Sequence, residues 1–494
     1  MSAPRHEDRS VSHNAAYALA NQLVTAALTA GLTVFLVRSL GPKEYGLFAL
    51  ALSVGTLVLL PADFGISAST SRFLAERRGR PEAAAAVLRL ALLLRLVSTV
   101  PIVIALWLLV GPIASAYGEP GLELPLRAMA AVLFGHSLLI LFRGVFNGLS
   151  RTDKTFWMIA VESAVETGAS VALVIAGGSA ADAAWGRAIG YSAGGLIGLV
   201  LVLRLLGRSV LPGMGGNRPE VPARAIARYA GALFIIDGAF TLFEQIDILL
   251  IGAYLGAASA GVFQAPLRLT TFLHYPGLAL ATAVAPRLAR RDDAAAVQTF
   301  ELALRVVIVT QMAFAVGAAV WAQPIADVAL GRDYRESADV LRALSPFIFL
   351  AGLAPLVSLA VNYLGEARRR VPIAIAAVVL NAGIDVALIP RIGVVAGAIG
   401  TGVAYALYVP AHLWLCHRVL RLDLRALART FARSLLAGAG LAAGLAVWGT
   451  SDLSVLQWAG GLATGTVVFV SLLALTRELT AADVSQVRAR FGKG

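Results

Sequence analysis

The sequence predicts an all-α polytopic membrane protein with about 14 transmembrane helices, arranged as two parallel six-helix lobes plus two extra C-terminal helices. Three observations predict this fold class: an apolar composition, regularly spaced apolar runs, and a second half that repeats the first. Of the 494 residues, 58% are hydrophobic and only 14% are charged, and the mean hydropathy is +0.78. A soluble protein is nearer a quarter charged, because its surface needs polar side chains. The composition therefore excludes a soluble fold of this size.

Cysteine content and net charge narrow the class further. The only cysteine, Cys416, excludes an internal disulfide and cannot by itself form a thiolate metal site. Residues 1–14 are polar and lead into an apolar run too long for a cleaved signal, so we expect no signal peptide. The net charge of +12 lies in short loops between apolar runs, which is a topology signal. We therefore expect no nucleic-acid partner.

Apolar runs long enough to cross a bilayer recur along the whole chain. A membrane helix needs about 20 mostly apolar residues. We expect spans at 15–38, 46–68, 90–114, 125–147, 156–177, 184–206, 229–253, 261–285, 303–327, 339–362, 371–390, 395–418, 429–449 and 455–476.

Positive charge distinguishes the two sides of the predicted membrane. The loops after even-numbered spans are rich in arginine, as in 72–80 and 368–370, whereas the loops after odd-numbered spans are short and nearly neutral. Cytoplasmic loops carry the excess of Lys and Arg. We therefore expect a multi-pass protein of the cell (inner, cytoplasmic) membrane with both termini in the cytoplasm.

A repeat with a register of 215 residues relates the two halves. The phrase L-G-x4-G-x-F occurs at Leu40 and again at Leu255, and further glycine, proline, arginine and asparagine positions match in the same register. Spans one to six are thus repeated by spans seven to twelve. Because six is even, the halves enter the membrane in the same direction and are parallel repeats. The glycines suit a tight turn between two helices, because glycine tolerates positive φ.

This repeat defines the predicted domains. The N-lobe covers 1–206 and the C-lobe 228–420, with a Pro-, Gly- and Arg-rich cytoplasmic linker at 207–227 between them. Residues 421–494 hold spans thirteen and fourteen, which have no partner in the repeat, and a cytoplasmic tail.

Pro61 and Pro276 occupy matching positions inside the second span of each half. Proline removes a backbone donor and kinks a helix. Breaks at corresponding positions of two repeats indicate a transport pathway. We therefore predict a helix kink at each proline.

Several carboxylates lie well inside predicted spans. Glu162 and Glu166 are four residues apart on span five, so they share one helix face, and Glu244 and Asp247 are three apart on span seven near Asp237. Adjacent carboxylates raise each other's pKa and can hold a proton or a cation. We predict ion coupling at these five residues; a structural ion pair with an arginine such as Arg143 or Arg268 remains the alternative.

Two arginines inside spans are candidates for substrate binding. Arg143 lies in span four and Arg268 in span eight. Arginine binds phosphate through two parallel hydrogen bonds, so either could hold an anionic head group. Arg95 and Arg305 lie nearer the cytoplasmic end of their spans, where snorkelling explains them.

Motifs for catalysis are missing from the sequence. We find no G-x4-G-K-[ST], H-E-x-x-H, C-x-x-C or G-x-S-x-G. The predicted outer loops are about a dozen residues or fewer, too short to carry the catalytic groups of a membrane polymerase or ligase. We therefore expect a transporter that is not an enzyme and that uses no cofactor or metal.

Five segments in order resemble one family. These are "VRSLGPKEYGLFALALSV" at 37–54, "DFGISASTSRFLAE" at 63–76, "NGLSRTDK" at 147–154, "NYLGEARRRVPI" at 362–373 and "GVVAGAIGTGVAYAL" at 393–407. The chain resembles the polysaccharide flippases of the multidrug/oligosaccharidyl-lipid/polysaccharide exporter superfamily over about residues 14–420.

The resemblance implies two six-helix lobes that work by alternating access. Its expected substrate is a lipid-linked oligosaccharide on a polyprenyl pyrophosphate, moved from the inner to the outer leaflet for surface polysaccharide or lipopolysaccharide biosynthesis. The expected partners are this substrate, membrane lipids, H+ or Na+, and polysaccharide polymerase or assembly proteins.

Two other transport functions remain as alternatives. A drug or cation exporter of the same superfamily would share the repeat, although arginines inside the spans favour an anionic substrate. A flippase for a peptidoglycan precursor would also have fourteen spans.

Overall fold

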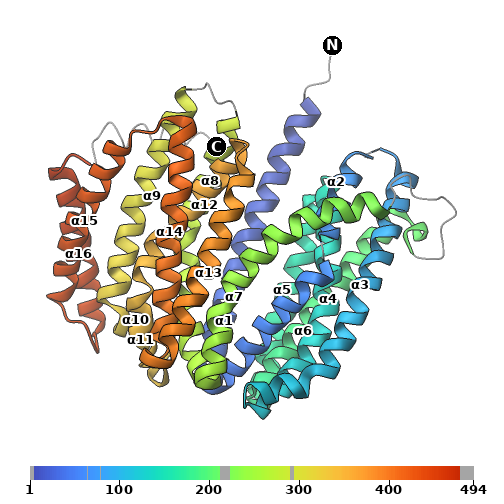
Figure 1. Cartoon of the computed structure of the whole chain (residues 1–494), viewed down its shortest axis with the longest axis horizontal. Helices are drawn as coiled ribbons and strands as arrows, with labels where there is room; N and C mark the ends of the chain where they lie inside the picture. Colours follow the sequence, from blue (N-terminus) through green and yellow to red (C-terminus); the bar gives the residue numbers. More distant parts are fainter. Residues whose placement is uncertain (1–4, 64, 78, 212–222, 290–293, 479–494) are drawn as a thin grey trace. The chain divides into compact units, whose positions relative to one another are not determined.

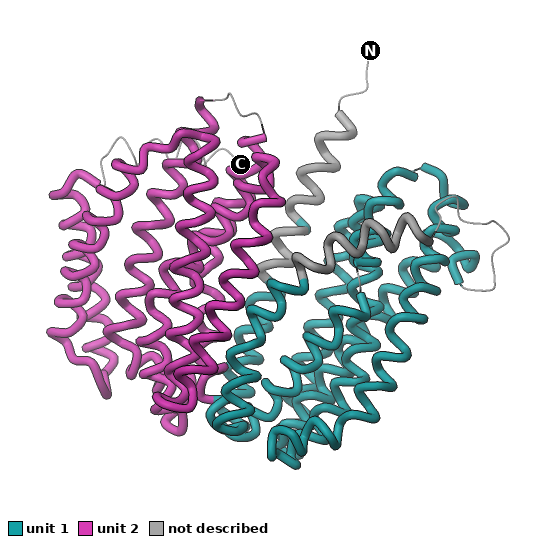
Figure 2. The backbone as a smooth tube through the Cα atoms, viewed as in Figure 1, with its two compact units in different colours: residues 1–261 teal, residues 262–494 magenta. Residues whose placement is uncertain are grey.

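The computed structural model describes residues 5–63, 65–77, 79–211, 223–289 and 294–478, and the side chains of 5–16, 18–23 and 223–237 lie outside this description. The described residues form helices and turns and contain no strand (Figure 1). They divide into two compact units, residues 1–261 and 262–494 (Figure 2). This division falls inside a long helix. The predicted domain bounds, with a linker at 207–227, remain a prediction, and 212–222 of that linker lie outside the described residues.

Unit 1 is built from long helices joined by short turns. The helices are α1 (Arg5–Asp63), α2 (Ile66–Ala75), α3 (Pro81–Ala116), α4 (Glu123–Gly148), α5 (Thr152–Gly177), α6 (Ala180–Leu206) and the first part of α7 (Ala223–Thr270), with short 3-10 turns η1 (Pro120–Leu122) and η2 (Arg208–Val210).

Unit 2 contains the rest of the chain. It has η3 (Thr271–His274), α8 (Tyr275–Val284), η4 (Ala285–Ala289), α9 (Ala294–Val320), α10 (Ala322–Ala329), η5 (Arg332–Tyr334), α11 (Ser337–Ala343), α12 (Ser345–Tyr363), α13 (Ala367–Ile392), α14 (Val395–Leu420), α15 (Leu424–Ala446) and α16 (Val455–Leu475).

The all-helical membrane fold class is confirmed. Among the described residues, eleven helical stretches are long and apolar enough to cross a membrane. Two of them, Val24–Asp63 and Gly238–Ala289, each cover two predicted spans. Helix α15, predicted as span thirteen, is not among the eleven and carries Arg425, Arg429 and Arg433. The count of fourteen spans stays a prediction.

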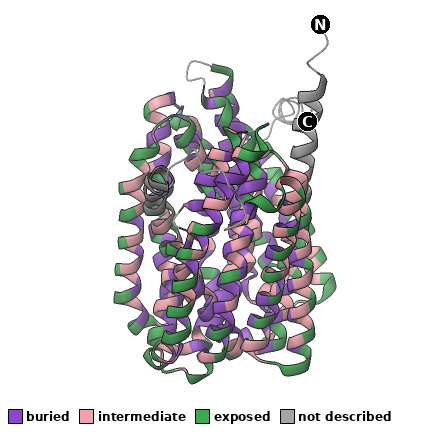
Figure 3. Ribbon diagram, turned by 90° about the vertical axis from the view of Figure 1, so that its right-hand side faces the viewer, coloured by how far each residue is buried: buried purple, intermediate pink, exposed green. Residues whose placement is uncertain are grey.

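Exposed apolar side chains fit a lipid environment. Trp107, Leu108, Ile175, Val379 and Val467 are each more than half exposed. In a polytopic helical protein such side chains face acyl chains, which are as apolar as the side chains themselves. Figure 3 shows the same pattern, with exposed residues along the outward faces of helices whose inner faces are buried.

Glycine makes the turn inside each of the two longest helices. Gly41 interrupts α1 with φ 71° and ψ 174°, and Gly256 interrupts α7 with φ 84° and ψ 177°. A side chain with a Cβ rarely adopts such positive φ, so the residue must be glycine. The turn predicted from the repeated phrase is therefore confirmed in both halves.

The second predicted span of each half is broken near its aligned proline. In unit 1, α1 ends two residues after Pro61, Gly65 has φ 68°, and α2 begins at Ile66. In unit 2, the 3-10 turn η3 precedes α8, which has Pro276 in its first turn. Each break frees backbone carbonyls that need new partners.

Polar side chains from the following long helix satisfy these carbonyls. Arg95 of α3 donates from Nη1 to the carbonyl of Ala62 at 3.1 Å, and Ser98 donates to the same oxygen at 2.8 Å. In unit 2, Gln311 of α9 donates from Nε2 to the carbonyl of Leu273 at 2.7 Å. The two units thus stabilise equivalent breaks with different residues.

The two extra helices dock on α9 in unit 2. Trp321, Ala437, Leu441, Phe469 and Leu473 form an apolar core between α9, α15 and α16. At one end of this core the buried carboxylate of Glu478 accepts hydrogen bonds from Arg305 at 3.1 Å, Thr430 at 2.6 Å and Arg433 at 3.1 Å. Arg305 is therefore held in an ion pair just beyond the end of α16, and the snorkelling expected for it stays a prediction.

Candidate functional site

Helices α5 and α6 bring two carboxylates and one arginine together inside unit 1. Glu162 and Glu166 of α5 are 6% and 8% exposed. Nη1 of Arg187, from α6, donates to Oε1 of Glu166 at 2.7 Å, and its Nη2 donates to the hydroxyl of Tyr191 at 2.9 Å. We call Glu162, Glu166, Arg187 and Tyr191 the α5–α6 cluster.

Within the cluster, the two carboxylates have different partners. Glu166 is paired with the guanidinium of Arg187, whereas Oε2 of Glu162 accepts a hydrogen bond from the hydroxyl of Ser163 at 2.9 Å. The ring of His136, from α4, lies 4.4 Å from the ring of Tyr191, measured between centroids. Two carboxylates and one guanidinium leave one negative charge when both acids are ionised.

A stripe of glycines on α6 makes room for the cluster. A Cβ on Gly190 would lie 2.4 Å from Cβ of Glu166, and one on Gly194 would lie 2.7 Å from Cβ of Glu162. Gly186 and Gly198 continue this stripe at the same spacing of four residues. Small residues at this spacing let membrane helices approach closely. The glutamates are therefore held directly against the backbone of α6.

The arginine partner of the acidic pair is Arg187, and sequence reasoning missed it. Among the described residues, the ion pair of Glu166 is with Arg187 and not with Arg143 or Arg268, the two arginines named as examples. The signal was present: Arg187 lies inside predicted span six, four residues before Tyr191 and beside the glycine stripe. Because Arg187 lies only three residues into that span, it resembles a charged residue at a helix end.

The second charged group of unit 1 lies at the broken helix. Arg95 is fully buried and donates from Nη2 to Oδ1 of Asp63 and, at 2.5 Å, to the hydroxyl of Ser67. The snorkelling expected for Arg95 is therefore wrong. Its side chain turns inward because the break next to Pro61 offers both a carboxylate and a free carbonyl.

The predicted substrate arginines have different surroundings. Arg143 is exposed on α4. Arg268, near the end of α7, is half-buried, and with the Gln264 amide oxygen turned toward it this guanidinium donates to Gln264 at 3.0 and 3.2 Å. The two arginines belong to different units, and each remains a candidate on its own.

The acidic residues of span seven are not equivalent. Asp247 is buried, whereas Glu244 is exposed. The side chain of Asp237 lies outside the described residues. In unit 2, Asp385 and Asn381 of α13 are fully buried, and Gly400 of α14 lies against both.

Helix breaks, buried charges and exposed apolar faces describe a polytopic membrane fold, and comparison with known proteins gives its family. A model of the family described as polysaccharide biosynthesis protein matches residues 11–291, more than half of the chain. The chain belongs to this family. The resemblance to the polysaccharide flippases is thereby confirmed.

Relatives and solved structures agree with this family. The chain is 22% identical over 391 residues to the probable low-salt glycan biosynthesis flippase Agl15 of Haloferax volcanii, covering 77% of this chain and 78% of the relative. Its fold is similar to that of the lipid II flippase MurJ, with a TM-score of 0.72, 13% identity and coverage of 94% and 99%. It is also similar to an inward-facing multidrug resistance MATE transporter, with a TM-score of 0.66, 18% identity and coverage of 81% and 95%.

For this polysaccharide biosynthesis protein, the structural likeness shows that its fold is shared with MurJ and with the MATE transporter. The matched segment, residues 11–291, includes the broken helix of unit 1 and the α5–α6 cluster. The family assignment therefore covers the part of the chain in which the charged groups of unit 1 lie.

Proposed function

We propose that this protein is a flippase that moves a lipid-linked oligosaccharide of the polyprenyl-pyrophosphate type from the inner to the outer leaflet by alternating access. The observation that carries the proposal is the family match over residues 11–291 on a fold shared with known transporters. The product serves surface polysaccharide or lipopolysaccharide biosynthesis. The membrane is the cytoplasmic membrane, with both termini inside and a polysaccharide polymerase or assembly protein as a downstream partner.

Names of the similar proteins support this substrate class. The relative from Haloferax volcanii is described as a glycan biosynthesis flippase, and the structure with a TM-score of 0.72 is a lipid II flippase. Arg143 and Arg268 each remain a separate candidate for binding the pyrophosphate, because a guanidinium matches phosphate oxygens in pairs.

The α5–α6 cluster supports a proton as the coupling ion. Arg187 neutralises Glu166, so one uncompensated charge belongs to Glu162. A sodium ion takes several oxygen ligands, and one of the two carboxylates of the cluster is already paired with Arg187. In the described part of the chain, no three Asp, Glu, His or Cys side chains gather as a metal site. A proton needs no set of oxygen ligands, and binding of one proton to Glu162 removes the remaining buried negative charge.

The other acidic candidates keep lesser roles in this proposal. Asp247 is buried and Glu244 is exposed, so their surroundings differ, and both stay candidates for ion coupling. Asp237 stays a candidate on sequence grounds.

Removing the gene tests the substrate class. We expect surface polysaccharide to fall at least ~10-fold. The lipid-linked intermediate should accumulate in the inner leaflet, because its synthesis continues without the flippase. Drug susceptibility and the pool of peptidoglycan precursor are measured in the same cells. Unchanged polysaccharide with raised drug susceptibility would replace this proposal by a drug exporter, and an accumulated peptidoglycan precursor would replace it by the other flippase.

A further inference from the structure

The two copies of the repeated phrase lie against each other inside unit 1. A Cβ on Gly46 would lie 1.7 Å from the carbonyl oxygen of Ala257, and a Cβ on Gly261 would lie 2.0 Å from that of Pro42. These two contacts exchange under the 215-residue register, since 46 corresponds to 261 and 42 to 257. The helices after Gly41 and Gly256 therefore cross backbone to backbone at a local pseudo-two-fold axis.

One carboxylate adds an unsymmetrical bond to this contact. Glu119, in the turn between α3 and η1, accepts a hydrogen bond from the backbone nitrogen of Ala257 at 2.9 Å. Ala257 begins the helical arm after Gly256, so the carboxylate also meets the positive end of that arm. The equivalent bond in the other direction cannot form, because position 42 is proline and has no N–H.

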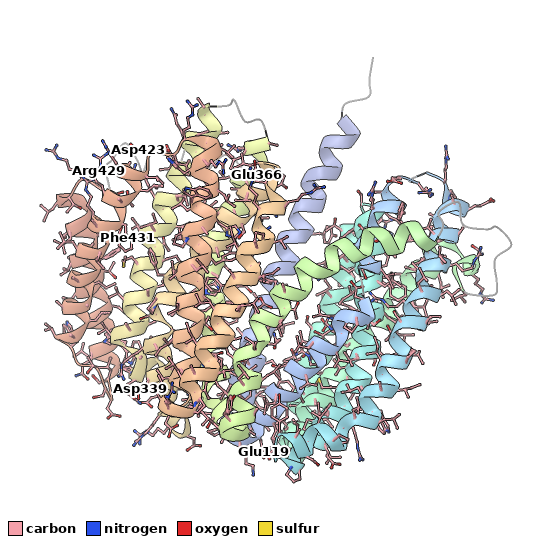
Figure 4. All side chains as sticks on the ribbon, in the orientation of Figure 1. Glu119, Asp339, Glu366, Asp423, Arg429 and Phe431 are labelled. Atoms are coloured by element: carbon pink, nitrogen blue, oxygen red, sulfur yellow. The ribbon has the colours of Figure 1, made fainter. Side chains whose placement is uncertain are left out.

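The turn that carries Glu119 is fixed to the first repeat. Leu122 is fully buried, and Gly121 lies against the side chain of Leu47 on α1. Glu119 is half-buried at one end of the molecule, near the lower end of α7 in Figure 4. Its carboxylate thus joins a rigid part of the first repeat to the first residue of a helical arm of the second.

A second glutamate makes a similar bond within the first repeat. Glu44, also half-buried, accepts from the backbone nitrogen of Ala180 at 2.8 Å, at the beginning of α6. Both bonds join a carboxylate to a helix N-terminus, and both are predicted to lie on the outer side. They differ in that the Glu119 bond connects the two repeats.

We propose that Glu119 is a latch that holds the crossed turns of the two repeats together and that releases once in each transport cycle. The inference rests on the proposed alternating-access function, in which the repeats must part at one side and then at the other. The crossing places the backbones at Gly46 and Gly261 in close contact, and the hydrogen bond to the charged Glu119 carboxylate adds a directional link across it. Glu119 is a positioning residue and has no contact with substrate assigned to it.

The rate of cysteine modification tests the latch without any glycan. The reporter is Leu50→Cys in a Cys416→Ser background, because Leu50 is fully buried over Gly252 of α7. The full-length protein is placed in lipid nanodiscs and treated with a water-soluble thiol reagent. Modification rates are compared with Glu119 intact, with Glu119→Ala, with the isosteric Glu119→Gln, and with Glu44→Ala as the matched control.

We expect Glu119→Ala to raise the modification rate ~10-fold and Glu119→Gln to raise it less, since the amide oxygen still accepts a hydrogen bond. Glu44→Ala should leave the rate within ~2-fold, because its bond stays inside one repeat. A second reporter, Leu88→Cys in the core of unit 1, should show no change in any variant. Equal rates for Glu119→Ala and Glu44→Ala, or equal acceleration at both reporters, would overturn the latch. Either result would leave the flippase proposal to its own glycan test.

Discussion

Arg187 is the residue on which the charge balance of unit 1 depends. Its guanidinium pairs with Glu166 and also lies over the ring of Tyr191, 5.0 Å from the centroid. Removing one partner of a buried ion pair leaves an uncompensated charge, which costs more than the pair itself contributes.

Arg187→Ala should therefore lower the free energy of unfolding by about 3 kcal/mol. The double variant Arg187→Ala with Glu166→Ala should recover part of this loss, because it leaves no lone charge at the pair. Unfolding in mixed detergent measures both. A double variant as unstable as the sum of the two single variants would contradict a direct pair.

In the proposed function, proton coupling depends on Glu162. In Glu162→Gln the amide keeps nearly the same shape and can accept from Ser163, but it cannot release a proton. We expect transport driven by a pH gradient to fall at least ~10-fold while exchange without a gradient continues. Ser163→Ala is the control, since it removes the hydrogen bond and keeps the acid. A Glu162→Gln variant that responds fully to the gradient would exclude Glu162 as the proton carrier.

Sequence reasoning found these acids and missed what neutralises them. The spacing of Glu162 and Glu166 placed both on one face of a helix, and both are buried on that face. The residue of α6 that faces these acids could not be predicted, because a single sequence does not show which residues of α5 and α6 are in contact. The direction of the Arg95 side chain was predicted wrongly for a related reason: it depends on the break in the preceding helix, whose geometry is set by the αL backbone of Gly65.

At the scale of elements, the glycine stripe of α6 sets how closely α5 can approach. A Cβ on Gly190 would lie within 2.6 Å of both Cα and Cβ of Glu166, so backbone as well as side chain would have to move. Gly168, on α5, has open space where a Cβ would be added.

We expect Gly190→Ala to destabilise the protein by about 1–3 kcal/mol through overpacking. Gly168→Ala should be neutral or slightly stabilising, because alanine favours a helix. Thermal unfolding of the two variants in one detergent compares them. Equal melting temperatures for Gly190→Ala and the unaltered protein would show that α5 and α6 are not held in this close approach.

Elements were predicted well where the apolar runs were isolated and less well where backbone geometry decides. The predicted spans at 156–177 and 184–206 correspond to α5 and α6 within a few residues. Predicted span nine, 303–327, is instead divided at Trp321 between α9 and α10, and span ten is divided at Leu344 between α11 and α12. Apolar composition indicates which segments lie in the membrane, but it does not indicate where a helix breaks.

At the scale of the whole chain, the two halves share backbone features but not the charged residues at matching positions. The 215-residue register places Asn381 opposite Glu166 and Gly402 opposite Arg187, so unit 2 has no copy of that ion pair at these positions. The backbone breaks are shared by the two halves, whereas their charges are not.

The predicted topology can be checked on single cysteines. Within unit 2, Glu366 and Asp423 lie at one end and Asp339 lies at the other, as alternate loops should (Figure 4). In a Cys416→Ser background, Pro120→Cys should react with a membrane-impermeant thiol reagent added to intact cells, whereas Arg80→Cys should react only after permeabilisation. The reverse labelling pattern would contradict the predicted orientation and place both termini outside.

The most direct measurement reconstitutes the purified protein in liposomes with a fluorescent polyprenyl-pyrophosphate oligosaccharide and follows its exposure to an impermeant quencher added outside. With the unaltered protein and a pH gradient, we expect the inner-leaflet probe to become accessible at least ~10-fold faster than in protein-free liposomes, and Glu162→Gln to abolish the effect of the gradient. Probe movement at the protein-free rate would contradict the account.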